Sequence, residues 1–402
     1  MKVLQINNVY NTGSTGKMTA DIHNELMNSG VESIVCYGRG KNVSERNVYK
    51  VCSEYGAKIN SGLAQITGIP YIAFPFSLRR IISIIKEEKP DIVHLQCING
   101  FFVNIYSLIN WLNKKNIKTI LTLHAEFMFT ANCSHSFECL SWKTQDSCNN
   151  CNRYKEATHS IFFNNTRRSF LKLKKSFQGF KDNLTVVSVS PWLCNRSKQS
   201  YILGEMKNIT ILNGVNTDVF RLYDTVPNKD KTVLHVTAKF SDVEGYSKGG
   251  SYIIKLAHNM PDIKFIVVAS VTDIKTTLPQ NIILISKYIS QNELAEMYSS
   301  ADLSIITSKR ETFSMPIAES LCCGTPVVGF KSGGPESIAL KEYSEFVDYG
   351  DLKKLEEAVR SMITKFSISD KKKIYESATK KYSKNNMTEN YILAYRELLN
   401  RK

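Results

Sequence analysis

Two glutamates, Glu311 and Glu319, stand eight residues apart in the segment SKRETFSMPIAESLCCGTPVVGFKSGGPES. On one continuous helix this spacing would place their side chains roughly 80° apart around the axis, which makes a poor shared face. A loop that holds Glu311 and a helix that holds Glu319 explain the spacing better. Pro316 fits the first turn of that helix, where a missing N–H costs nothing, and Gly324 fits its end.

This loop and helix start favour the binding of a nucleoside diphosphate. The first N–H groups of a helix have no partner within it, so the backbone around Phe313, Ser314 and Met315 can receive a diphosphate. Glu319 lies further inside the helix, and its carboxylate can accept two adjacent hydroxyl groups. A ribose offers such a pair.

The segment NTGSTGKMTAD, residues 11–21, follows an apolar run and resembles a phosphate-binding loop at first sight. A Walker loop needs four residues between its first glycine and the Gly-Lys pair, and then Ser or Thr. Here two residues separate Gly13 from Gly16, and Met18 follows Lys17. The sequence therefore predicts a strand, a glycine turn and a helix start, and it argues against a nucleoside triphosphatase.

Short apolar runs alternate with amphipathic stretches along the chain, which predicts parallel sheets covered by helices on both faces. A chain of 402 residues with 43% hydrophobic content suits two such domains. We expect them to join near residues 203–212, with active-site loops at the carboxyl ends of the strands. The expected strands are 1–9, 31–38, 90–96, 118–124, 183–190, 232–238, 263–270, 281–287, 302–308 and 325–330.

No apolar run reaches the roughly 18 residues of a membrane-spanning helix, and no signal peptide is recognisable at the start. We therefore expect a cytoplasmic protein. Its ten cysteines are then expected to be reduced, so a cluster of cysteines favours metal over disulfides.

The basic charge is concentrated in the first half. Residues 1–212 hold 26 Lys and Arg against 14 Asp and Glu, and the rest hold 26 against 23, which gives the net charge of +15. Nucleic acid, an anionic membrane surface and a phosphorylated substrate are all compatible partners. The basic segment 166–181 has apolar residues at helical spacing, which predicts either a helix lying on anionic lipid or a surface helix with its apolar stripe in the core.

Four cysteines, Cys133, Cys139, Cys148 and Cys151, fall within nineteen residues and end in a CxxC pair. That spacing is typical of a closed tetrahedral zinc site, structural because four sulfurs leave no position for water. His135 can replace one of these ligands, and four free thiols in a loop are the simpler alternative.

The motifs together resemble glycosyltransferase family 4, the retaining enzymes with the GT-B fold. The likeness is carried by the two glutamates at EX7E, by ILNGVNTDVF, by CGTPVVGFKSGGPES and by KPDIVHLQCINGFFVNIYSLINWL, and it covers nearly the whole chain. It implies an α/β protein of two facing Rossmann-like domains with a donor cleft between them. We expect an acceptor-side domain at 1–205 with the cysteine insertion, a nucleotide-sugar domain at 206–382, and a C-terminal helix at 383–402 that returns to the first domain.

The resemblance assigns roles to individual residues. It implies that Glu319 holds the ribose, that Glu311 contacts the donor sugar, and that Lys248 offsets the charge of the leaving diphosphate. Lys239 is a candidate for the family's second cation, although the usual Gly-Arg-Leu turn reads differently here. His124 matches the family histidine that reaches the donor sugar, while Ala125 stands where an Asp is common.

By the same resemblance, the turn at GSTGK closes over the donor's diphosphate. The implied reaction moves a sugar from a UDP-sugar, in preference to a GDP-sugar, to a lipid-linked acceptor in surface polysaccharide synthesis. Front-face attack retains the anomeric configuration, and no catalytic metal is expected. The expected partners include an anionic membrane surface and exclude nucleic acid, because the aromatic residues of the basic segment form one stripe and no stacking platform.

Two alternatives remain. One is a nucleotide-sugar epimerase of the same fold, and the other is a basic, zinc-containing nucleic-acid-binding protein. Among the other candidate residues, we expect His94 and His235 to be core histidines at strand ends. We expect Glu336 to be a carboxylate at a helix N-terminus.

Overall fold

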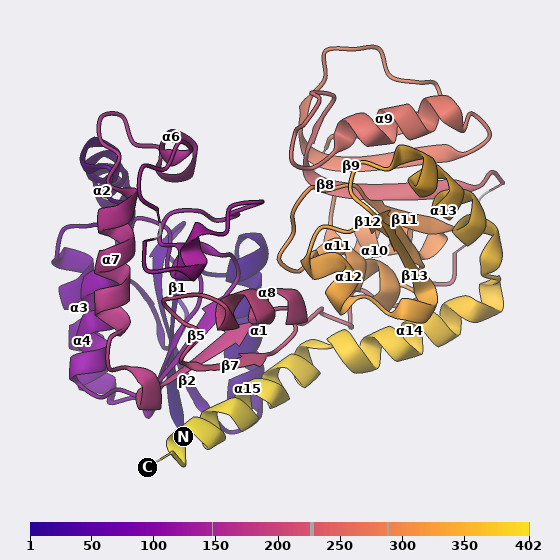
Figure 1. Ribbon diagram of the computed structural model, residues 1–402. Helices are drawn as coiled ribbons and strands as arrows, with labels where there is room; N and C mark the ends of the chain where they lie inside the picture. The colour runs from indigo at the N-terminus through magenta and orange to yellow at the C-terminus, as the bar shows by residue number, and fades with distance from the viewer. Residues whose placement is uncertain (147, 226–228, 288, 402) are drawn as a thin grey trace. The chain divides into compact units, whose positions relative to one another are not determined.

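The computed structural model describes residues 1–146, 148–225, 229–287 and 289–401, which form two compact units (Figure 1). The first unit comprises Met1–Leu212 and the described residues from Met387 onward, and the second comprises Asn213–Asn386. Each unit is a parallel β-sheet with helices between its strands, so the predicted α/β class with two doubly wound domains is confirmed.

The first unit's described residues contain a seven-stranded parallel sheet in the order β3-β2-β1-β4-β5-β6-β7. Its central strands read Val, Ile and Leu almost continuously because both faces are covered by helices. The strands are β1 (Lys2–Val9), β2 (Glu32–Arg39), β3 (Val48–Lys50), β4 (Ile92–Leu95), β5 (Thr119–Leu123), β6 (Leu184–Ser188) and β7 (Lys207–Thr210).

The helices of the first unit connect these strands in the βαβ manner. They are α1 (Gly13–Asn28), α2 (Glu54–Thr67), α3 (Phe76–Glu88), α4 (Ile105–Lys114), α5 (Phe127–Thr130), α6 (Tyr154–Thr158), α7 (Thr166–Phe177) and α8 (Pro191–Lys198), with the 3-10 turns η1 (Ser141–Lys143) and η2 (Lys181–Asn183). The last helix, α15 (Lys384–Leu399), buries Tyr391 and Tyr395 in this unit.

The second unit's described residues contain a six-stranded parallel sheet in the order β10-β9-β8-β11-β12-β13. Phe240, Phe265 and Leu256 are fully buried in its core, which α9 and α13 cover. The strands are β8 (Thr232–Ser241), β9 (Lys264–Asp273), β10 (Ile282–Ile285), β11 (Leu303–Ile306), β12 (Val327–Phe330) and β13 (Ser344–Val347). The helices are α9 (Gly250–Asn259), α10 (Gln291–Ser300), α11 (Met315–Cys322), α12 (Gly334–Ile338), α13 (Leu352–Lys365) and α14 (Ile368–Tyr382), with the 3-10 turn η3 (Lys341–Tyr343).

All ten predicted strands are present, and three further strands were missed. The missed strands, β3, β7 and β13, are three or four residues long and partly exposed, so they lack a buried apolar run. The join between domains was expected near residues 203–212, and the boundary between the two units falls at the end of that range, between Leu212 and Asn213. The segment 203–212 contains β7, which pairs with β6 at the edge of the first sheet. Within the described residues, no helix is both long and apolar enough to cross a membrane.

Candidate active site

Three loops meet at the carboxyl edge of the second sheet, the edge at which α/β sheets bind their ligands. They follow β8, β11 and β12. The amide of Lys309 donates to the carbonyl of Ser247 (2.8 Å), and the amide of Glu311 donates to the carbonyl of Ser332 (3.1 Å). The amide of Gly334 then donates to the carbonyl of Glu311 (2.8 Å). These backbone bonds fix the three loops against one another.

Two glycines allow this close approach. A Cβ at Gly334 would lie 2.4 Å from the carbonyl carbon and oxygen of Thr312. A Cβ at Gly249 would lie 2.1 Å from the carbonyl oxygen of Thr307, and Gly249 also has a φ of +70°. No side chain fits at either position, so the glycines of YSKGG and SGGPES are required by backbone contact.

The structure brings the predicted residues Lys248 and Glu311 together. Lys248 Nζ lies 2.6 Å from Glu311 Oε1, and the two side chains are 35% and 19% exposed. The backbone holds the lysine in place, because its carbonyl accepts a hydrogen bond from Thr307 Oγ1 (3.1 Å). A ligand can therefore reach a compact positive charge whose carboxylate partner is already positioned.

The start of α11 carries a strained residue. Ser314 precedes the helix with φ 79° and ψ 87°, a left-handed conformation that few residues other than glycine adopt. Phe313 and Ser314 are buried, while Met315 and Pro316 are half-buried. Backbone strain of this kind clusters at ligand-binding sites, because the surrounding structure must be built to hold it.

Glu319 lies on α11 and Glu311 lies in the preceding loop, which confirms the predicted division between loop and helix. The hydroxyl of Tyr298 donates to Glu319 Oε2 at 3.4 Å. Burial, followed by the charge of Glu319, raises the pKa of Tyr298 well above its ordinary value. The tyrosine therefore remains a neutral donor that orients the carboxylate.

Glu336 has the structural role that its position predicts. Its carboxylate accepts hydrogen bonds from the amides of Ser332 (3.0 Å) and Gly333 (2.9 Å) at the start of α12. It thereby fixes the second glycine turn next to the Glu311 loop.

Lys239 has its own partner in the structure. It lies on β8 and pairs with Asp273 on β9 (3.1 Å), with its Nζ 5.2 Å from the centre of the Tyr246 ring. Its place as a second cation beside the diphosphate stays a prediction.

In the first unit, the glycine loop after β1 is a tight strand-to-helix turn. Helix α1 begins at Gly13, which has a φ of +63°, and the amide of Asn11 donates to the carbonyl of Gly16 (2.9 Å). A Cβ at Gly16 would lie 2.9 Å from Val9 Cγ2, so this glycine lets the helix pack on the strand. The role of Gly13 and Gly16 toward a diphosphate stays a prediction.

His124 directly follows β5 and is half-buried. Its Nε2 lies 3.3 Å from Gln96 Oε1. The surrounding protein desolvates the ring and lowers the pKa of His124 to about 4, so the imidazole is neutral at physiological pH.

His94 and His235 are core residues, as predicted. His94 bonds Tyr395 Oη through Nδ1 and Thr122 Oγ1 through Nε2, both at 2.8 Å, and burial lowers its pKa to about 3. His235 donates from Nδ1 to the carbonyl of Ile305 (3.0 Å), and burial lowers its pKa to about 4.

The structure does not support the predicted zinc site. Among the described residues, no three His, Cys, Asp or Glu side chains are grouped so that they can hold a metal ion. Cys139 is exposed, and the thiol of Cys148 donates to the carbonyl of Thr130 (3.8 Å). Burial, with smaller effects from Cys148 and Cys151, raises the pKa of Cys133 to about 12.

The basic segment 166–181 is a surface helix whose apolar stripe lies in the core. Helix α7 packs against α4 (Figure 1), and Lys174 donates to the hydroxyl of Tyr201 (2.6 Å). At most 1% of each apolar side chain of the stripe is exposed: Phe170, Leu173, Phe177 and Phe180. The hypothesis that these residues lie in lipid is therefore wrong.

Exposed apolar side chains gather elsewhere in the first unit. We call them the α2 patch: Tyr55, Ile59, Ile66, Phe74, Phe76, Ile161, Phe162 and Phe163, each at least 47% exposed. The segment 161–163 packs on the end of α2, where the amide of Ile161 donates to the carbonyl of Gln65 (3.0 Å). A cavity of about 510 Å³ between α2 and α3 is lined by Ile59, Phe74 and Phe76.

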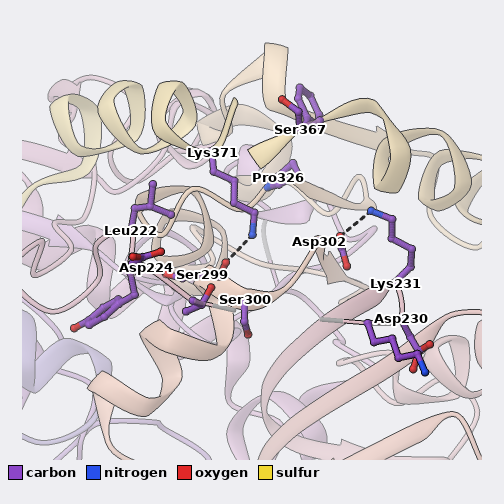
Figure 2. A pocket seen from close by; sticks show the side chains of 14 residues that line it. Leu222, Asp224, Asp230, Lys231, Ser299, Ser300, Asp302, Pro326, Ser367 and Lys371 are labelled. Carbon is purple, nitrogen blue, oxygen red and sulfur yellow. Dashed lines mark hydrogen bonds and ion pairs between the residues drawn. The ribbon is translucent and has the colours of Figure 1, made fainter. Parts of the chain in front are cut away.

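The second unit also has a pocket of about 540 Å³ (Figure 2). Lys231, Asp302 and Pro326 line it and directly precede β8, β11 and β12, so it lies at the amino edge. Figure 2 shows Lys371 turned toward the carbonyl of Ser299 (2.6 Å) and Lys231 paired with Asp302. Because parallel α/β sheets bind their ligands at the carboxyl edge, we do not assign the reaction to this pocket.

Sequence reasoning missed two features of these sites. Gln96 contacts His124, and Gln5 contacts Gln96. Gln5 lies on β1 and Gln96 directly follows β4, and a polar residue beside the apolar positions of a buried strand was an available signal. The left-handed Ser314 had no signal, because serine is common before helices in ordinary conformations.

Two family models match the chain. The model described as "Glycosyltransferase Family 4" matches residues 15–219, and the one described as "Glycosyl transferases group 1" matches residues 228–381. Together they span both units and include Lys248, Glu311 and Glu319.

Two relatives are similar to the chain over different shares of its length. The Escherichia coli (strain K12) protein WcaC, which is named as a colanic acid biosynthesis glycosyl transferase, is 24% identical over 163 residues. This match covers 38% of the present chain and 39% of the relative. A 41.2 kDa protein from the cps region of Klebsiella pneumoniae is 21% identical over 325 residues, with 79% and 81% of the two chains covered.

Among solved structures, HepE from Anabaena in complex with UDP-glucose superposes with a TM-score of 0.63. Its sequence is 12% identical, and the superposition covers 99% of this chain and 100% of that one. At this identity the likeness concerns the fold, which is the GT-B arrangement of two parallel-sheet α/β domains.

Proposed function

The chain belongs to glycosyltransferase family 4, and we propose that it transfers a sugar from a nucleoside diphosphate sugar to a saccharide acceptor with retention of the anomeric configuration. The observation that carries this proposal is the Lys248–Glu311 pair at the carboxyl edge of the second sheet, beside the strained start of α11. Lys248 and the backbone amides at the start of α11 match the charged diphosphate of a nucleotide sugar, and Glu319 on the same helix matches its ribose.

The nucleotide half of the donor binds the second unit in this proposal. Glu319 accepts hydrogen bonds from the two ribose hydroxyls, and the hydroxyl of Tyr298 fixes the carboxylate from its other side. The backbone at Phe313, Ser314 and Met315 receives the diphosphate at the start of α11, where amides and the helix dipole favour an anion.

The chemical step follows from these positions. The bond between the sugar C1 and the phosphate oxygen breaks, and the diphosphate leaves with the electron pair. Lys248 neutralises the charge that develops on it, which lowers the barrier because the ammonium is already held in place. The acceptor hydroxyl attacks C1 from the same face, and its proton passes to the departing phosphate oxygen.

Glu311 contacts the donor sugar in this account. While no donor is bound, it pairs with Lys248, and this pairing keeps the cation aimed at the loop. Once the diphosphate replaces Glu311 as the partner of Lys248, the carboxylate can accept hydroxyl groups of the sugar. We propose UDP as the nucleotide, with support from the fold shared with HepE, which was solved with UDP-glucose.

The α2 patch supports a lipid-linked acceptor. Soluble monomers rarely expose a contiguous apolar surface of this kind unless it meets a partner or a membrane. Exposed Lys58 on α2 and exposed Arg79 and Arg80 on α3 accompany the patch, so the surface combines apolar and basic groups. A lipid-linked saccharide resides in a bilayer. An anionic bilayer offers hydrocarbon to the apolar groups of this surface and negative charge to its basic groups.

Vesicle sedimentation tests this surface. Replacing Phe74 and Phe76 with Ser should weaken binding to phosphatidylglycerol vesicles about tenfold or more, because each aromatic ring removes area from water on insertion. Leu393→Ser is the matched control, since Leu393 is 60% exposed on α15 and lies outside the patch. If both variants and the parent bind the vesicles equally, the α2 patch is not the surface that binds the membrane.

The transfer itself is tested by incubating the protein with a panel of UDP- and GDP-sugars and a lipid extract, and then determining product mass and the anomeric proton coupling by NMR. The expected product contains one added sugar in the donor's own anomeric configuration. Inversion would reject the retaining mechanism. Interconversion of UDP-sugars without an acceptor would instead identify an epimerase.

A further inference from the structure

A line of polar side chains crosses the buried sheet of the first unit and ends at His124. Its inner members are almost completely buried, with exposed fractions of 0% for Gln5 and Ser33, 1% for Gln96 and 3% for His23. Burying so many polar groups is costly unless each one is hydrogen-bonded. The hydrogen-bond partner of each group therefore shows how the line is held together.

The half of the line nearest the candidate site consists of two glutamines. His124 Nε2 lies 3.3 Å from Gln96 Oε1, Gln96 Nε2 lies 2.7 Å from Gln5 Oε1, and Gln5 Nε2 lies 3.4 Å from Ser33 Oγ. Ser33 lies on β2 and Gln5 on β1, while Gln96 and His124 directly follow β4 and β5, so the line runs across neighbouring strands of the sheet.

The other half ends at a carboxylate. Ser33 Oγ lies 2.8 Å from His23 Nδ1, and His23 Nε2 lies 3.7 Å from Glu45 Oε1. Tyr10 also donates to Glu45 Oε1 (2.8 Å). Burial lowers the pKa of His23, so it enters the line as a neutral imidazole with one N–H.

Glu45 lies within ion-pair range of His23 and beyond hydrogen-bond distance, and its negative charge favours an N–H at the near ring nitrogen, Nε2. An ionised carboxylate only accepts, so the N–H of His23 faces Glu45 and its Nδ1 accepts from the Ser33 hydroxyl. Ser33 then accepts from the amide NH₂ of Gln5. The oxygen of Gln5 in turn accepts from the NH₂ of Gln96, which leaves the oxygen of Gln96 to accept from His124.

We infer that Gln96 is a positioning residue that holds His124 as its Nε2–H tautomer and thereby makes Nδ1 a hydrogen-bond acceptor toward the donor sugar. This inference rests on the proposed function for the presence of a sugar at His124. The line without Glu45 would permit the opposite direction, with Nδ1–H on His124, so the remote carboxylate determines the tautomer.

The tautomer restricts the donor. A neutral histidine that presents an acceptor binds a hydroxyl or an amide N–H of the sugar. It does not bind a carboxylate, which needs a donor or a cation. The group of the sugar that contacts His124 is therefore a hydroxyl or an N-acyl amine and is not the acid group of a uronic acid.

His94 does not interfere with this assignment. It lies on the same sheet, but both of its ring nitrogens are bonded, to Tyr395 and Thr122. Thr122→Val thus provides a matched control, because it removes buried hydrogen bonds beside the line without touching a member of it.

The tautomer is tested by two-bond ¹H–¹⁵N NMR on the complete protein labelled at histidine, with His124→Asn used to assign the signals. This readout needs no donor. We expect the His124 signals of an Nε2–H tautomer in the parent and in Thr122→Val, and a mixture of tautomers in Gln96→Leu. An Nδ1–H tautomer in the parent, or an unchanged pure tautomer in Gln96→Leu, would overturn the inference.

Two further variants keep the test decisive if Gln96→Leu does not fold. Gln96→Glu places a carboxylate beside Nε2–H and should raise the pKa of His124, which an NMR titration measures. Glu45→Gln changes a partly exposed residue at the far end and should shift part of the His124 population to Nδ1–H. If the pKa of His124 is unchanged in Gln96→Glu, or its tautomer population is unchanged in Glu45→Gln, the inference is contradicted.

Donor binding then separates the inference from the proposed function. In a panel of UDP-sugars that each lack one hydroxyl, one compound should bind the parent about 3- to 10-fold more weakly, the equivalent of one neutral hydrogen bond. This penalty should fall below about twofold in Gln96→Leu and persist in Thr122→Val. If no nucleotide sugar binds, the proposed function fails while the tautomer result stands.

Discussion

The two units position their reactive groups by different means. In the second unit, backbone hydrogen bonds and glycine contacts between loops hold Lys248 and Glu311, and both side chains stay partly exposed. In the first unit, a line of buried side chains holds His124, and two glutamines lie next to it. We therefore expect a glycine-to-alanine substitution in the loops to disrupt the site of the second unit. In the first unit, we expect the loss of a glutamine side-chain amide to have this effect.

This difference suits the two roles that we propose. A diphosphate carries a large charge and is bound by a fixed cation and a helix start, which tolerate small displacements of the ligand. A sugar hydroxyl is distinguished by the direction of a single hydrogen bond, which requires a defined tautomer. In this proposal, the rigid backbone of the second unit holds the cation that neutralises the diphosphate. The line of buried side chains in the first unit fixes the tautomer of His124 that recognises the sugar.

The largest effect is expected at the cation. Lys248→Met should reduce kcat about 100- to 1000-fold, or about 3–4 kcal/mol, because the charge on the leaving diphosphate loses its fixed partner. The measurement is steady-state transfer from UDP-sugar. Lys255→Met serves as the control, since Lys255 forms an exposed ion pair with Glu244 in the same unit. A loss of less than threefold for Lys248→Met would mean that the loops of the second unit do not hold the leaving group.

The next effect concerns the ribose. Glu319→Ala should weaken UDP binding by about 1–3 kcal/mol in calorimetry, because two hydroxyls lose a charged acceptor. Glu296→Ala, an exposed position on α10, should leave the affinity unchanged. Unchanged affinity for both UDP and GDP in Glu319→Ala would refute the ribose assignment.

Two glycines test the importance of backbone contact. Gly249 and Gly245 both have a positive φ (+70° and +77°), but only a Cβ at Gly249 meets another atom. Gly249→Ala should therefore lower the free energy of unfolding by about 1–3 kcal/mol more than Gly245→Ala in urea titrations. Equal losses would show that conformation alone, and not loop contact, requires the glycine.

The smallest effect is a difference in acid sensitivity. The folded pKa values of His94 and His124 in the first unit (about 3 and 4) and of His235 in the second (about 4) lie below the unfolded value. Lowering the pH below about 6.5 protonates the unfolded chain first, so stability is lost as pH falls toward 4. At pH 5.5 each of these histidines lowers the free energy of unfolding by about 1.4 kcal/mol.

Hydrogen exchange at pH 7 and pH 5.5, corrected for intrinsic rates, measures this loss in each unit. The opening free energy of the first unit should fall by at least about 1.2 kcal/mol more than that of the second, because the pKa values of His23, His94 and His124 are all lowered in the first unit, against that of His235 in the second. A larger loss in the second unit would contradict the burial of His94 and His124.

The sequence allowed the fold, and the division of the second unit's candidate site between a loop and a helix, to be predicted because both depend on contiguous segments. Central strands are long apolar runs, and Glu311, Pro316 and Glu319 lie within nine residues, so local rules were sufficient. Strands β3 and β7 escaped prediction because they are short and half-exposed, and their pairing with distant strands defines them.

Groups brought together by tertiary contacts could not be predicted in the same way. Lys248 and Glu311 are 63 residues apart, and Gln5 and Gln96 are 91 apart. Cysteine spacing says nothing about the direction in which thiols point, which is why the zinc prediction failed. The spacing of apolar residues along α7 is the same whether the helix lies on lipid or packs against a protein core. Only the position of the sheet distinguishes these two environments.

In the proposed function, the second unit binds the nucleotide at the carboxyl edge of its sheet. Hydrogen exchange with mass spectrometry, with and without saturating UDP, tests it without an acceptor. We expect protection in peptides covering 247–250, 311–319 and 333–336, and little change in those covering 222–225 and 369–373 at the amino-edge pocket. Protection of the amino-edge peptides instead, or of none in this unit, would contradict the claim.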